Sequence, residues 1–256
     1  MNLAELLDEL RSNVLRDSSG LISGPSDLLW TDEALVRYLN DGQRRFARRT
    51  LCLRDGTTPD CCEITLNEGV TDYTLHRSVL AVLSARNEDQ AFFIPRGGQT
   101  ATMGSMQPET EPYGSWSTAV PTAPGLPRIW TTDEQIEVGD TNSLQVIHFT
   151  VYPTPSAAEE GKRVFIRVSR LPLVNFDVAD LGREPEIPED YHLDLLEWVA
   201  YRAKRNWDVD GEDKKSADSH KARFDQCVAE AIQEAKRKVF VPAQWQFGMN
   251  GFSHSG

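Results

Sequence analysis

Cysteine is scarce in this chain, and its placement excludes two kinds of protein. Four cysteines occur among 256 residues, namely Cys52, Cys61, Cys62 and Cys227. A disulfide between the neighbours Cys61 and Cys62 would be strained, so a disulfide framework is not expected. Paired C-x-x-C elements of a structural zinc site are absent as well. We interpret all four residues as reduced thiols of a protein made in the cytosol.

Long apolar runs and positive charge are also lacking. No run of about 18 apolar residues exists that would span a bilayer, and the opening MNLAELLDE has acids where a signal peptide needs a basic region. Lys and Arg number 27 against 39 Asp and Glu, for a formal net charge of −12. This balance argues against a free-standing nucleic-acid binder and against a protein held on anionic membranes, because both need a basic field.

Catalytic motifs are missing too. The chain has no G-x-S-x-G, H-E-x-x-H, Walker loop or G-x-G-x-x-G. Its five histidines are scattered, without the four-residue spacing that places two metal ligands on one helix face. The acidic run Asp208–Asp213 could attract calcium, but it lacks the third ligand and the final glutamate of an EF-hand loop. We therefore interpret that run as a turn between helices, and we expect no metal, no cofactor and no enzymatic activity.

Hydrophobic spacing predicts two helices before residue 51. Leucines and a valine over residues 3–16 recur at intervals of three and four, which makes one apolar stripe. A second helix follows Trp30, with Thr31 as its N-cap. Its apolar face consists of Leu35, Leu39 and Phe46. Gly42 lies inside this helix, where glycine lowers helix stability by about 1 kcal/mol relative to alanine. A glycine at this position indicates that another backbone packs closely against it.

The period then changes to that of strands. Residues 63–66 and 163–168 alternate as half-buried strands do. Further β-rich runs, separated by turn residues, are 79–83, 91–94, 128–131 and 144–152. The loop 95–127, crowded with Gly, Pro, Ser and Thr, is longer than compact domains normally contain, and loops of that kind usually serve a function or stay disordered.

Helical spacing returns after Pro188, which suits a first-turn position. We expect one apolar face on this helix, made of Leu193, Leu196, Ala200, Ala203 and Trp207. A last helix runs over about residues 213–238, with a stripe of Ala217, Lys221, Phe224, Val228, Ala231 and Ala235. Two such helices joined by an acidic turn are typical of an αα-hairpin.

Together these segments predict an α+β protein. We expect an antiparallel helical bundle with a central antiparallel β insertion and an extended C-terminal tail. Residues 1–50 would supply the N-terminal helices of the bundle and residues 51–187 the β-rich insertion. Residues 188–238 would form its C-terminal helical hairpin, and residues 239–256 would be a docking tail.

The tail is unusual in composition, because residues 239–256 contain no Asp, Glu, Lys or Arg. They do contain four large aromatic residues, Phe240, Trp245, Phe247 and Phe252. Solvated coils are poor in aromatics, and soluble monomers normally hide this much apolar area. Two interpretations stay open: the tail packs on its own domain, or it docks on a neighbouring chain.

Basic residues gather on the second predicted helix. They are Arg37, Arg44, Arg45, Arg48 and Arg49. Such a cluster could meet phosphates or an acidic protein surface, or it could compensate the helix dipole and pair with the surplus acids. The cluster lacks interleaved aromatics and a DNA-binding motif, so we favour contact with another acidic subunit. The five arginines are candidates for a subunit interface or for the lining of a DNA channel.

Three parts of the chain carry motifs that occur together in one family. Residues 30–44, WTDEALVRYLNDGQR, give a helix start and a basic end. GLPRIW at 125–130, VYPTP at 151–155 and LPL at 171–173 mark a sheet region. Residues 188–203, PEDYHLDLLEWVAYRA, form the third motif. In this order the motifs resemble those of the phage head-to-tail adaptor, or head-completion, proteins.

The resemblance implies a structural, non-enzymatic virion protein at the head-to-tail junction, made in the host cytoplasm. Such adaptors form a closed ring of about twelve copies, a dodecamer, below the portal. The implied partners are the portal protein, other copies of the chain, a downstream tail or nozzle protein, and double-stranded DNA in passage, with no membrane. C-terminal segments of such adaptors commonly reach into the portal, so Phe240, Trp245 and Phe247 are expected as buried anchors there.

Other classes of function stay open beside this one. A tail-completion or tail-tube protein would also form rings and lack catalytic motifs. A glycan-binding module could stack sugar rings on Tyr113 and Trp116 of the long loop. An enzyme using pairs of acids is the least favoured, because no two carboxylates lie in an apolar setting that would raise one pKa.

Overall fold

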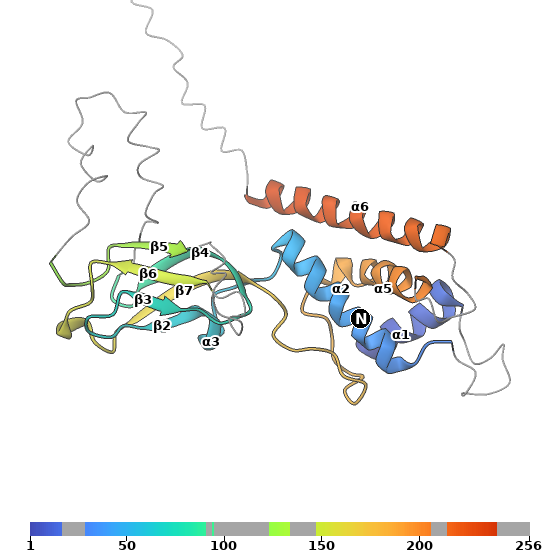
Figure 1. The fold of residues 1–256 in the computed structure, drawn as a ribbon, viewed down its shortest axis with the longest axis horizontal. Coiled ribbons are helices and arrows are strands. Elements are labelled where there is room, and N and C mark those ends of the chain that lie inside the picture. The colour runs from blue at the N-terminus through green and yellow to red at the C-terminus, as the bar shows by residue number, and fades with distance from the viewer. Residues whose placement is uncertain (17–28, 91–93, 95–122, 134–146, 206–213, 240–256) are drawn as a thin grey trace, which may run out of the picture.

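The computed structural model describes residues 1–16, 29–90, 94, 123–133, 147–205 and 214–239. These residues form two parts that lie side by side along the longest dimension (Figure 1). We call one the helical unit, which contains helices α1, α2, α5 and α6. The other is the β unit, which contains all seven strands and the short helix α3. No described helix combines the length and the apolarity needed to cross a bilayer.

The N-terminal helices of the helical unit begin at well-formed caps. Helix α1, Leu3–Glu9, opens with a capping box in which Asn2 and Glu5 satisfy each other's backbone N–H groups, and it continues as a π-helical turn over Leu10–Leu15. Helix α2, Asp32–Thr50, begins after Thr31, whose hydroxyl accepts a hydrogen bond from the N–H of Ala34. The N-cap expected from the sequence is therefore confirmed.

The C-terminal helices of the helical unit follow a short 3-10 turn over Glu189–Tyr191. Helix α5, Asp194–Lys204, packs against α2, against the π-helical turn and against α6, which spans Lys214–Val239. Helix α5 is buried on most of its circumference, which suits its central position. Leu193 was expected on the apolar face, but it is 53% exposed. It precedes the first regular turn of α5, so the helical period does not yet apply to it.

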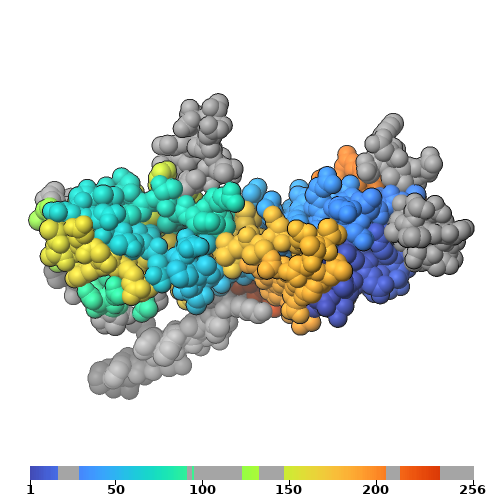
Figure 2. Space-filling view, turned by 90° about the horizontal axis from the view of Figure 1, so that it is seen from below, coloured from blue at the N-terminus to red at the C-terminus, as the bar shows by residue number. Residues whose placement is uncertain are grey.

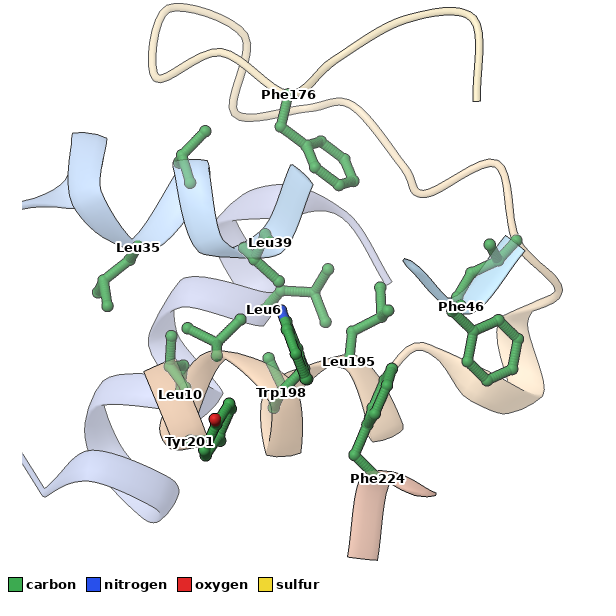
Figure 3. Close-up of a cluster of buried hydrophobic side chains, with 14 of the residues drawn as sticks. Leu6, Leu10, Leu35, Leu39, Phe46, Phe176, Leu195, Trp198, Tyr201 and Phe224 are labelled. Carbon is green, nitrogen blue, oxygen red and sulfur yellow. The ribbon is translucent and has the colours of Figure 1, made fainter. Parts of the chain in front are cut away.

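The core of the helical unit centres on Trp198 of α5. Figure 3 shows Trp198 among leucines of α1 and α2, with Phe224 of α6 beside it. Its ring centroid is 5.2 Å from that of Phe224, and its indole N–H donates to Asp41. A Cβ on Gly42 would lie 2.9 Å from the Trp198 ring. The sequence led us to expect a backbone against this glycine. That expectation is wrong, because a side chain occupies the space.

The β unit holds two antiparallel sheets. The first sheet is built on β7, Arg163–Arg170. It pairs along one edge with β1, Arg54–Asp55, and β2, Glu63–Thr65, and along the other with β4, Val79–Asn87. The second sheet has the order β3-β6-β5, formed by Asp72–Thr74, His148–Tyr152 and Ile129–Asp133. Helix α3, Pro59–Cys62, precedes β2.

Side chains from both sheets meet in one buried cluster, separate from the core of the helical unit. Trp130 of β5 stacks on Phe149 of β6 with ring centroids 5.5 Å apart. Val164, Ile166 and Val168 reach the same cluster from alternate positions of β7. The period-two pattern thus places the apolar face of each sheet toward a shared interior.

The mixed helix-and-sheet content confirms the α+β class. Most of the strands expected from the sequence are present. The sequence did not predict β1 and β3, because strands of two or three residues are too short to show an alternating pattern. Of the run 91–94, only Ile94 is described, and it bridges to Ala85. Trp207, most of the long loop, the run 208–213 and residues 240–256 lie outside the described part of the chain.

Candidate functional site

A basic groove lies where the C-terminal half of α2 meets the β unit. It has a volume of about 520 Å³. Its lining consists of Arg44 and Arg48 of α2, Asp60 of α3, the turn residues His76, Arg77 and Ser78, and Leu171, Pro172 and Leu173 after β7. We use the name basic groove for this set of residues.

The wall formed by α2 follows from helical spacing. Arg44 and Arg48 are four residues apart, so their side chains leave the same face of the helix. Phe46 and Ala47 are fully buried on the opposite side, which fixes the rotation of α2 and keeps both arginines exposed. Their position near the helix C-terminus is also favourable for positive charge, because the carbonyl ends of the helix point there.

The turn between β3 and β4 forms the facing wall, and hydrogen bonds define the state of His76. Its Nδ1 accepts from the backbone N–H of Ser78 at 3.3 Å and lies 2.8 Å from the hydroxyl of Ser78. The thiol of buried Cys61 lies 3.5 Å from the same nitrogen. A backbone N–H can only donate, so Nδ1 carries no proton and the ring proton resides on Nε2. The remaining ring nitrogen of His76, Nε2, is therefore a donor.

The third wall, residues 171–173, is fastened to both units. The N–H of Leu171 donates to the carbonyl of Ser78 at 2.8 Å. Oε1 of Glu186 accepts from the N–H of Leu173 at 2.8 Å, while its Oε2 pairs with Arg170. Figure 2 shows that the chain following β7, coloured yellow to orange, covers the junction of the two units. The groove is therefore held open between anchored segments.

Arg170 and Asp55 form a buried charge pair near the groove. Nε of Arg170 lies 2.7 Å from Oδ2 of Asp55. Burial raises the pKa of Asp55, but hydrogen bonds from Thr57, Thr58 and Arg170 outweigh it and hold the pKa well below its usual range. Asp55 therefore stays ionised, and its hydrogen-bonding partners are Thr57, Thr58 and Arg170. It does not pair with the arginines of the groove.

The charges that face the groove are unbalanced. Arg44, Arg48 and Arg77 face one carboxylate, Asp60, and none of these four side chains forms an ion pair with another described residue. His76 adds an N–H donor through Nε2. Three unpaired cations around one cavity attract an anionic group, and guanidinium groups bind carboxylates and phosphates through paired hydrogen bonds.

The structure divides the five arginines singled out in the sequence. Arg44 and Arg48 line the basic groove. Arg45 lies 4.4 Å from the centroid of the Trp198 ring, and Arg49 forms an ion pair with Asp225 of α6. Arg37 is exposed on α2 outside the groove. The five arginines thus have three kinds of surroundings, and Arg44 and Arg48 are the two that line the basic groove.

Sequence reasoning missed the β-unit side of this groove. His76, Arg77 and Asp60 belong to segments with no chemical motif, and they reach α2 only through the tertiary fold. The adjacent basic pair His76-Arg77 in a turn was the one available signal. The aromatic residues of the tail, and Tyr113 and Trp116, lie outside the described residues. Within the described ranges, no group of three His, Cys, Asp or Glu side chains is placed to hold a metal ion.

A second, smaller pocket of about 320 Å³ is lined by Tyr38, Tyr201, Arg202 and Arg205. Arg202 stacks over Tyr38 at 5.4 Å and lies 3.6 Å from Asp41. Arg205 stacks over Tyr201 and donates to its hydroxyl. These cations have partners within the protein, unlike those of the basic groove, so the groove is the stronger binding site.

Comparison with known proteins identifies a family. The chain matches the family model described as SU10 adaptor protein over residues 1–246. No curated protein matches the chain.

Proposed function

The chain belongs to the SU10 adaptor protein family, a phage head-to-tail adaptor family, and we propose that copies of it form a ring that joins the portal to the tail. The family makes it a structural protein of the phage particle. In the proposal the ring lies below the portal and surrounds the channel through which DNA leaves the capsid. The observation that carries it is the family match over 246 of 256 residues.

The two units have different roles in this proposal, in line with their separate cores. In the proposal, α1, α2, α5 and α6 act as one antiparallel bundle, with α5 and α6 as its C-terminal hairpin. Residues 51–187 act as an insertion that widens the subunit. The separation of the two buried clusters supports this division, because each unit has an interior of its own.

The role we propose is non-enzymatic. The described thiols support this, because burial is the largest influence raising the pKa of both Cys62 and Cys227 to about 12. The charge of Asp55 adds to the effect at Cys62, and a hydrogen bond with Asp194 adds to it at Cys227. Both thiols stay protonated at neutral pH, whereas nucleophilic catalysis uses the thiolate.

The C-terminal tail is the proposed portal anchor. Helix α6 ends at Val239, and the aromatic, charge-free segment with Phe240, Trp245, Phe247 and Phe252 follows it. Aromatic side chains that fill pockets contribute much of the free energy of binding at protein interfaces. We expect that ending the chain at Val239 abolishes its binding to purified portal rings, as measured by sedimentation of the complex.

The matched control for this deletion replaces residues 240–256 by a Gly/Ser segment of equal length. It keeps the chain length but removes the aromatics, and we expect the same loss of binding. Portal binding at wild-type strength by either variant contradicts the proposed anchor. Unchanged thermal unfolding of both variants shows that the helical unit is intact.

Copy number separates this function from that of a tail-tube ring. Native mass spectrometry of the chain with its portal should give a complex containing about twelve copies of the chain. A sixfold ring that forms without the portal contradicts the adaptor role and favours a tail tube. The formal charge of −12 supports the further proposal of an acidic channel wall, from which DNA phosphates are repelled.

A further inference from the structure

We propose that the basic groove binds an acidic segment of a second copy of this chain, and that residues 177–190 are that segment. The inference rests on the proposed association of copies and names the two surfaces that meet. The segment lies between β7 and the 3-10 turn that precedes α5, and we call it the acidic segment.

The donors in the groove suit carboxylates. Arg44 and Arg48 approach from α2, and Arg77 comes from the facing turn. The Nε2–H of His76 adds a donor of fixed identity, because Nδ1 is occupied by donors from Ser78.

The remaining lining favours a peptide over duplex DNA. Leu171, Pro172 and Leu173 give the groove an apolar wall, and Leu173 is 37% exposed. Asp60 is the one carboxylate in the lining and faces three arginines, so the groove keeps an excess of positive charge. The chain has 39 acids against 27 basic residues, so many carboxylates are available on a neighbouring copy.

The acidic segment has complementary chemistry. Residues 177–190 hold six acids and a single basic residue, Arg183. Glu186, Asp180 and Glu189 already pair with Arg170, Arg183 and the N-terminal ammonium group, respectively. The other three, Asp177, Glu184 and Asp190, are exposed and pair with no described cation. Leu181 on the same segment is 45% exposed and could meet the apolar wall.

The acidic segment is fastened to the helical unit of its own copy, and its Glu186 also bonds the groove wall at Leu173. The N–H groups of Leu3 and Ala4 at the start of α1 donate to the carbonyls of Arg183 and Leu181, at 2.8 and 3.0 Å. Just before the segment, Phe176 donates its N–H to the side chain of Asn40 on α2 at 2.8 Å. These contacts hold the first half of the segment on the helical unit and leave Asp177 and Glu184 exposed to another molecule.

The symmetry of the contact follows from these positions. The groove and the acidic segment are different surfaces, so one copy's segment in the next copy's groove is a head-to-tail contact. Repeated head-to-tail contacts close into a ring when the rotation between copies divides a full turn. This is the type of contact that a ring-shaped adaptor needs.

Charge reversal tests the pairing. Arg44→Glu with Arg48→Glu should weaken association of copies about tenfold or more, since each reversal replaces attraction by repulsion. Asp177→Lys with Glu184→Lys should weaken it similarly. In a 1:1 mixture of the two variants, the lysines in the segment of one variant can pair with the glutamates in the groove of the other. The mixture should therefore form complexes again. Analytical ultracentrifugation measures association, and native mass spectrometry assigns the composition of each complex by mass.

Arg54→Glu is the control, because Arg54 is an exposed arginine of β1 outside both the groove and the acidic segment. It should associate as the wild type does. Equal association of the groove variant and the wild type, or failure of the mixture to recover, overturns the pairing while the ring remains. A wild-type chain that stays monomeric even on the portal overturns the ring and the pairing together. Duplex DNA binding that is lost in the groove variant overturns the peptide assignment in favour of phosphates.

Discussion

The helical unit and the β unit build their cores from different parts of the chain. The buried cluster of the β unit uses residues from Cys61 to Val168, which form one continuous stretch. The cluster of the helical unit joins residues up to Leu53 with residues from Phe176 onward. The β unit is therefore local in sequence, whereas the helical unit forms only when both ends of the chain meet. Each unit therefore has an interior of its own, and a change in one core need not reach the other.

Both units combine ion pairs with arginines that stack on aromatic rings. In the helical unit, Arg45 stacks on Trp198 and Arg49 pairs with Asp225. In the β unit, Arg163 pairs with Glu63 of β2 and with Glu88, which directly follows β4. Between the units, buried Arg170 pairs with Asp55 of β1 and with Glu186 before α5. The two cores are thus separate, and an ionic junction links them.

The largest expected effect comes from Trp198→Ala. Truncation of a buried aromatic side chain should lower the free energy of unfolding by about 3–5 kcal/mol. Hydrogen exchange resolved by mass spectrometry should show faster exchange in α2, α5 and α6 and unchanged protection in β6 and β7. Phe149→Ala is the matched variant in the other core and should give the reverse pattern. Equal loss of protection in both units from either variant would show a single cooperative core.

The next largest effect concerns the junction. Arg170→Met leaves the carboxylates of Asp55 and Glu186 without their cation, and it should cost about 2–3 kcal/mol of unfolding free energy. Glu186 keeps some contact with water, so the cost stays below that of a fully buried pair. Urea denaturation at neutral pH measures it, and Arg170→Lys should recover part of the loss.

The same variant has a distinct dependence on pH. The pKa of Asp55 is lowered on folding, so its contribution is present above the pKa of the unfolded carboxyl, about 4, and is lost as the pH falls toward the folded value. Arg170→Met removes one cause of the lowering, so stability should fall less steeply with acid than in the wild type. An equally steep fall in both proteins would show that Arg170 does not set the pKa of Asp55.

The smallest effects on stability are expected for alanine substitutions at two glycines, one limited by a close contact and the other by its backbone conformation. Gly42→Ala forces a Cβ against Trp198, which should cost about 1–3 kcal/mol, reduced by the better helix propensity of alanine. Gly161→Ala meets no neighbour but must adopt a φ of +80°, which should cost about 1 kcal/mol. Thermal unfolding measures both variants. In a Trp198→Phe background the cost at Gly42 should shrink and the cost at Gly161 should not.

Local signals predicted much of the fold. Thr31 caps α2 as expected, and the alternation of residues 163–168 gives the strand β7 on which the larger sheet is built. Both depend on neighbours within a few residues. Leu193 and Gly42 were misjudged because their surroundings depend on where α5 begins and on which face it turns toward α2. The basic groove was predicted only in part. The sequence singled out Arg44 and Arg48 within a cluster of five arginines, but it did not distinguish them from the other three.

By itself, the sequence determined the secondary structure, the α+β class and the resemblance to head-to-tail adaptors, because period, caps and motifs are read along the chain. Only the tertiary structure decided which arginines face an open cavity. It placed Trp198 under Arg45 and Asp225 beside Arg49, while His76 and Arg77 came to face Arg44 and Arg48. The physical reason is that a charge interacts most strongly with groups within a few ångströms, and residues far apart in the sequence become such neighbours only through the tertiary fold.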